Sequence, residues 1–145
     1  MDKFLKKCNI KLLRDEAVLI EDAFYLYGRP DYERPGRGIE KRKTPEEITE
    51  ELDKSKPILV LDHEPRELQE LAEAGVDLDL CGHTHDGQMF PGNLITSLSW
   101  ENSCGYLKKG EMHNIVTSGV GVFGPNMRVG TKSEICGVEV RFLPE

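Results

Sequence analysis

Three of the four histidines in this chain of 145 residues each follow an apolar run, where side chains can act together. They are His63, His83 and His85. Neutral imidazole binds zinc, iron, nickel, copper and manganese, so three histidines brought to one place would form a metal site. Asp62 and Asp86 flank them and could orient the rings by accepting their N–H groups.

The elements that would position these histidines form a strand–helix–strand unit. Residues 57–61 are continuously apolar, which is typical of a strand buried on both faces. Residues 65–74 have helical spacing of apolar side chains and end before Gly75, and residues 76–81 form a second strand. The strands of such a unit are parallel and about 4.8 Å apart, with their carboxyl ends at one edge. We therefore expect the three histidines to converge.

The alternative is that this spacing is a coincidence. His113 lies in a predicted strand and is interpreted as an ordinary structural histidine. Gly82 favours the convergent arrangement, because a glycine lets the backbone turn sharply at the end of the second strand. His83 and His85 then stand two residues apart in a loop, where they can face one site or two adjacent sites.

The remaining predicted elements complete an α/β fold, or an α+β fold with a mixed sheet. A short charged helix is possible at residues 2–8, and residues 17–27 read as a β-hairpin. Residues 44–52 begin with a capping box and form a helix. Residues 112–117 and 135–142 are predicted as half-exposed antiparallel strands. The whole chain, residues 1–145, is interpreted as one domain.

Residues 28–43 differ from the rest of the chain because glycines, prolines and basic residues interrupt any apolar pattern. We predict a flexible basic loop here. It is either a solvated insertion or a basic lid over an anionic substrate.

Composition excludes several classes of protein. The hydrophobic fraction of 38% with 14 glycines is typical of a globular domain, and no apolar run is long enough to span a membrane. The net charge of −7 argues against electrostatic binding of nucleic acid. The N-terminus has no signal-peptide pattern and the four cysteines form no C-x-x-C pair, so we expect a cytoplasmic location.

Two motifs carry a family resemblance. The sequence ILVLDHEP at residues 58–65 and the sequence GVDLDLCGHTHDGQ at residues 75–88 resemble the carboxyl-terminal half of the calcineurin-like metallophosphoesterases. Residues 116–121 and 125–128 resemble the glycine-rich segment of the bacterial phosphodiesterase-like branch. The resemblance extends over residues 56–141 and implies part of a β-sandwich flanked by helices.

The resemblance implies hydrolysis of phosphomonoester or phosphodiester bonds by a two-metal mechanism. His63 and His83 would bind one metal ion and His85 the other, the metals being manganese, iron or zinc. Arg128 would be a charge partner for the phosphate-ester substrate.

The chain departs from the family in lacking its three earlier motifs, D-x-H, G-D-x-x-D and G-N-H. These motifs supply the bridging aspartate, further ligands and the histidine that protonates the leaving group. We therefore expect the carboxyl-terminal portion of a longer domain, inactive without its N-terminal half. An upstream anchor would make the protein membrane-associated, and an exposed half-sheet would allow the fragment to dimerise.

Two other interpretations remain open. One is a non-catalytic binding module that keeps the same fold. The other is a small domain with a mononuclear zinc site formed by Cys81, His63, His83 and His85.

Overall fold

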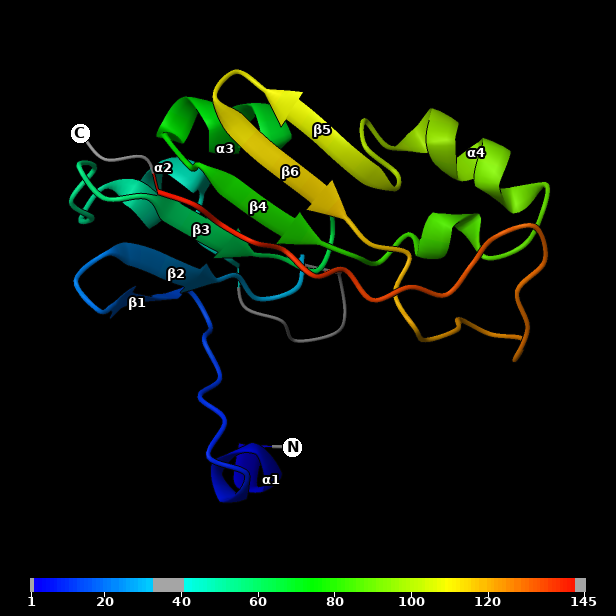
Figure 1. Ribbon diagram of the computed structural model, residues 1–145, viewed down its shortest axis with the longest axis horizontal. Coiled ribbons are helices and arrows are strands. Elements are labelled where there is room, and N and C mark those ends of the chain that lie inside the picture. Colours follow the sequence, from blue (N-terminus) through cyan, green and yellow to red (C-terminus); the bar gives the residue numbers. More distant parts are fainter. Residues whose placement is uncertain (1, 33–40, 143–145) are drawn as a thin grey trace.

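The computed structural model describes residues 2–32 and 41–142 and shows one mixed six-stranded sheet (Figure 1). The strand order is β1-β2-β3-β4-β6-β5, and the α/β fold class is confirmed. β2, β3, β4 and β6 run parallel to one another, while β1 and β5 are antiparallel to their neighbours. The bounds are β1 Glu16–Ile20, β2 Phe24–Gly28, β3 Ile58–Leu61, β4 Leu78–Cys81, β5 Gly105–Lys109 and β6 Met112–Val116.

The four parallel strands end at the same edge of the sheet. Gly28 of β2 lies opposite Leu61 of β3, and Leu61 lies opposite Leu80 of β4. Cys81 lies opposite Val116, where β6 ends. The loops that follow these strands therefore leave the sheet side by side, which is where open α/β sheets gather ligands.

The predicted strand–helix–strand unit is confirmed as β3, α3 (Leu68–Ala74) and β4. Gly75 ends α3 in the left-handed region, with φ of 91° and its N–H bonded to the last helical carbonyls. The predicted hairpin is confirmed as β1 and β2. Its turn places Glu21 and Asp22 in the left-handed region, as a tight hairpin turn requires.

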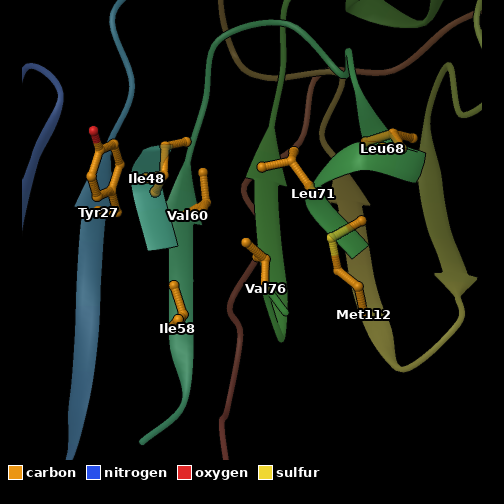
Figure 2. Packing of buried hydrophobic residues seen from close by; sticks show 8 residues of the cluster. All are labelled: Tyr27, Ile48, Ile58, Val60, Leu68, Leu71, Val76 and Met112. Atoms are coloured by element: carbon orange, nitrogen blue, oxygen red, sulfur yellow. The ribbon is translucent and has the colours of Figure 1, made fainter. Parts of the chain in front are cut away.

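The helix predicted at residues 44–52 is confirmed as α2 (Pro45–Thr49), with both hydrogen bonds of the capping box present. α2 and α3 cover one face of the sheet, and Figure 2 shows the core between these helices and the strands. Burying an aliphatic side chain in such a core contributes roughly 1.5–3 kcal/mol. The core cluster consists of Tyr27, Ile48, Ile58, Val60, Leu68, Leu71, Val76 and Met112.

The opposite face of the sheet is covered by a segment that we predicted to be a strand. Residues 135–142 form no strand, so that prediction is wrong. Val138 and Val140 do line a cavity of about 530 Å³ together with Leu59 of the sheet. The ring of Phe142 stacks on Phe24 with 5.4 Å between centroids. The alternating pattern thus identifies side chains that lie toward the sheet, although the backbone of this segment forms no strand pairing with it.

The strand predicted at residues 112–117 is β6, but its surroundings differ from the prediction. It pairs parallel with β4 and antiparallel with β5, so it is an inner strand of the sheet. The structure also contains the short helix α1 (Asp2–Lys7), a 3-10 turn η1 (His85–Gly87) and α4 (Gly92–Ser99). α1 lies apart from the sheet (Figure 1) and buries none of its residues.

No helix among residues 2–32 and 41–142 combines the length and the apolar character needed to cross a membrane. Within the segment predicted as a basic loop, Gly28 closes β2 and both Arg29 and Arg42 are buried. Residues 33–40 lie outside the described residues, so flexibility there stays a prediction.

A buried polar network crosses the helix-covered face of the sheet. Asp79 accepts hydrogen bonds from Asn114 Nδ2 at 2.9 Å and from Cys81 Sγ at 3.0 Å. Asn102 in turn donates to Asn114 Oδ1 at 2.7 Å. Asp79 Oδ1 is buried without a partner among the described residues. Burial therefore raises the pKa of Asp79 to about 6.

The raised pKa of Asp79 predicts a pH-dependent stability. The carboxyl group of Asp79 binds a proton more tightly in the native state than in the unfolded state. The protonated carboxyl therefore contributes stability at pH 4, and this contribution is lost as pH rises through 6. Replacing Asp79 by Asn removes that loss. Relative to wild type, the free energy of unfolding of Asp79→Asn should rise by on the order of 1–3 kcal/mol between pH 4 and 7.5.

Urea denaturation at the two pH values measures this change. Glu111→Gln is the matched control, because that side chain is 97% exposed. An unchanged difference between Asp79→Asn and wild type at both pH values would show that Asp79 is ionised in the native state throughout.

Candidate metal centre

The three predicted histidines line one cavity of about 420 Å³ at the carboxyl edge of the parallel strands. His63 comes from the loop after β3, and His83 and His85 come from the loop after β4. The structure thus brings together the residues that the sequence placed at two strand ends. The complete lining among the described residues is Asp31, His63, His83, Thr84, His85, Gly87, Gln88, Thr96 and Phe123.

Two of these histidines point ring nitrogens at each other. His63 Nε2 and His83 Nδ1 are 2.9 Å apart, and the two rings meet edge to face. Two nitrogens that bind one cation, each at about 2.1 Å, would be separated by about 3.4 Å in a tetrahedral site and by about 3.0 Å at a right angle. The observed spacing is that of a hydrogen bond, and it lies close to the spacing that a shared metal ion would need.

A buried carboxylate stands behind His83. Glu64 is only 2% exposed, and its Oε1 lies 3.4 Å from His83 Nε2, the nitrogen that faces away from His63. Metal-binding histidines commonly hold their second nitrogen against a carboxylate, which fixes the tautomer and the ring. Glu64 was missed in the sequence analysis. The sequence feature that could have identified Glu64 is its position, immediately after a candidate metal ligand at the end of a strand.

A stack of cationic and aromatic groups supports the same ring. The Trp100 ring contacts the His83 ring edge to face, with centroids 5.6 Å apart. The guanidinium of Arg66 lies 4.7 Å from the Trp100 centroid and 5.0 Å from that of Tyr32. Arg66 also donates to Glu64. His83 is thereby held on two sides by groups from separate loops.

The loop that carries His83 and His85 has an uncommon backbone. Both residues have left-handed φ angles, 69° and 52°. A residue other than glycine held in this region costs on the order of 1–3 kcal/mol, and such strain clusters at functional sites. Gly87 is required here, because a Cβ would lie 2.3 Å from the backbone nitrogen of Asn93 at the start of α4.

Asp62 lies outside the cavity, in a buried ion cluster. Its side chain is fully buried and lies 3.0 Å from Arg29 Nη1 and from Arg42 Nη1. Both arginines also bind Glu67, at 2.8 and 2.5 Å. Burial raises the pKa of Asp62, and the two guanidinium groups act against that effect. Asp62 Oδ1 accepts from the backbone N–H of His63 at 2.7 Å and so positions that residue.

Arg128 binds backbone carbonyls rather than opening onto the cavity. Its Nη2 donates to the carbonyls of Ser118 and Gly121 at 2.6 and 2.7 Å, and its Nη1 donates to that of His85 at 3.0 Å. Nη2 is also 3.4 Å from His85 Nδ1. Arg128 therefore clamps the glycine-rich segment onto the His85 loop.

Other candidate residues are not brought to the site. Asp86 does not line the cavity. Cys81 donates to Asp79, and burial raises the pKa of its thiol, so it offers the histidines no thiolate. His113 is hydrogen-bonded to Tyr106 Oη at 2.8 Å, away from the other histidines.

The donor set fits part of a metal centre. Among residues 2–32 and 41–142, no three His, Cys, Asp or Glu side chains are close enough together to hold a metal ion. His63 and His83 supply two converging nitrogens, which is half of a four-ligand site. No lysine or arginine of the described chain lines the cavity, so its lining favours a cation over a free anion.

Comparison with known proteins shows similarity to metallophosphoesterases. A protein of Aquifex aeolicus named an uncharacterized metallophosphoesterase is 33% identical over 95% of this chain and 53% of its own length. One of Helicobacter pylori with the same name is 35% identical over 98% of this chain and 38% of its own length.

A transmembrane protein with metallophosphoesterase domain from Danio rerio is 31% identical over 94% of this chain and 32% of its own length. The chain thus spans about half or less of the curated relatives it matches. No family model matches the chain. No solved structure matches it.

The position of Glu64 predicts the tautomer of His83. A carboxylate near Nε2 favours a proton on that nitrogen, so wild-type His83 should be mainly the Nε2–H form at neutral pH. Glu64→Gln removes the charge and should give a mixture of both tautomers. Long-range ¹H–¹⁵N NMR distinguishes the two forms. Glu70→Gln on the exposed side of α3 is the control, and an unchanged His83 spectrum in Glu64→Gln would contradict the prediction.

Proposed function

Because this chain belongs to the calcineurin-like metallophosphoesterase superfamily, we propose that it forms the histidine-bearing part of a metal-dependent phosphoesterase active site. The observation that carries the proposal is the 2.9 Å approach of His63 Nε2 and His83 Nδ1. His85 lines the same cavity. The reaction is hydrolysis of a phosphomonoester or a phosphodiester.

The role of the cavity residues in this proposal is to bind and orient. His63 and His83 would hold one divalent cation, manganese, iron or zinc, and His85 would hold a second. Such cations would neutralise phosphate oxygens and would lower the pKa of a water molecule, so that hydroxide is available to attack phosphorus. Such charge neutralisation is needed here, since the described lining contains a carboxylate and no lysine or arginine.

Each histidine has a residue that orients it. Asp62 accepts the backbone N–H of His63, and Glu64 faces the second nitrogen of His83. Arg128 holds the carbonyl of His85 and lies near its Nδ1. We propose that Asp62, Glu64 and Arg128 are positioning residues, and that the donors still missing come from an N-terminal half like that of the longer relatives.

The proposal predicts that the chain binds a divalent cation through His63 and His83. His63→Ala and His83→Ala should each weaken Mn²⁺ binding by more than about tenfold, because each removes a converging nitrogen. His113→Ala is the matched control, since His113 is bonded to Tyr106 outside the cavity. The free Mn²⁺ signal in electron paramagnetic resonance measures the affinity. Equal affinity in all three variants would overturn the proposed centre.

The chain alone should hydrolyse phosphate esters poorly even with metal bound. The family's acid that protonates the leaving group is absent from this sequence, and such an acid contributes roughly 10²–10⁴-fold. We expect hydrolysis of bis(4-nitrophenyl) phosphate with Mn²⁺ to be at least about 100-fold slower than by the Aquifex aeolicus relative. A comparable rate would show that these residues suffice for catalysis.

A further inference from the structure

A carboxylate from a third loop faces the cavity that the histidines line. Asp31 is half-buried and follows β2, the neighbour of β3 in the sheet. Gly28, Leu61 and Leu80 lie opposite one another across the three parallel strands. Asp31 comes three residues after Gly28. His63 comes two residues after Leu61, and His83 comes three residues after Leu80. The register therefore brings Asp31 to the level of the two converging histidines.

The chain around Asp31 is held by contacts on both sides of this residue. Before it, the backbone N–H of Arg29 donates to the carbonyl of Leu61 at 3.0 Å, which continues the β2–β3 ladder beyond the strand. After it, the Tyr32 ring has the guanidinium groups of Arg42 and Arg66 at 4.9 and 5.0 Å from its centroid. Asp31 thus stands on an anchored stretch of backbone.

Among the described residues of the lining, no lysine or arginine balances the charge of Asp31. Asp31 Oδ1 accepts from the backbone N–H of Tyr32 at 2.9 Å. In the part of the chain that the structure describes, Asp31 is the one carboxylate of the lining, and the lining contains no lysine or arginine. A carboxylate in this position repels a phosphate group and attracts a cation.

We propose that Asp31 is a further cation-binding residue of this centre, an inference that rests on the proposed function. Asp31 supplies the negative charge that the two imidazoles lack. The described His, Cys, Asp and Glu side chains form no group of three within coordinating distance, so Asp31 acts on the cation through its charge and through hydrogen-bonded water. Groups of this kind typically change metal affinity by about 10–100-fold.

The test is the affinity of the 145-residue chain for Mn²⁺, which suits oxygen donors and avoids the four cysteine thiols. Asp31→Asn should weaken binding by about tenfold or more, whereas Asp31→Glu, which keeps the carboxylate, should stay within about threefold of wild type. Glu21→Gln is the matched control. It also removes one negative charge, but from the exposed turn at the far end of β2.

Circular dichroism of each variant checks that the fold is kept, which is expected because Asp31 is only half-buried. Wild-type binding together with equal affinity in Asp31→Asn would overturn the role of Asp31 and leave the histidine centre standing. Equal weakening in Asp31→Asn and Glu21→Gln would reduce the effect to net charge and overturn it as well. A wild-type chain that binds no Mn²⁺ would overturn the centre itself and this inference with it.

Discussion

The buried carboxylate of Asp62 determines how the carboxyl edge of the sheet is arranged. Two guanidinium groups from distant positions, Arg29 and Arg42, meet on it and on Glu67. Burying such a cluster brings little net stability, but removing one member leaves an uncompensated charge and costs on the order of 3–5 kcal/mol. The cluster thereby forces the segment after β2, the segment before α2 and the end of β3 into one arrangement, with His63 directly beside it.

The cavity then follows from three neighbouring loops. β2, β3 and β4 end at one level, and their loops contribute Asp31, His63 and the His83–His85 pair in spatial order across the sheet. Strain in the His83 loop is offset by contacts outside the strands, from Trp100 and from Glu64.

The sequence predicted what depends on local pattern and missed what depends on distant pairing. The capping box at Thr44, the stop at Gly75 and the convergence of the histidines are readable from spacing alone. Asp31 and the pairing of Arg29 with Asp62 are not, because only the parallel pairing of β2 with β3 brings residues some 30 positions apart together. Residues 135–142 show the same limit, since alternation identifies the face that is turned toward the sheet without specifying a partner strand.

If His63 and His83 hold the proposed cation, the proton shared between the two rings must leave. At 2.9 Å, either His63 Nε2 donates to His83 Nδ1 or the reverse. A metal needs both nitrogens without protons, so one ring must change tautomer. Glu64 favours the proton on the far nitrogen of His83, which leaves Nδ1 free to accept. The change therefore falls on His63, whose ring is exposed and free to exchange its proton with water.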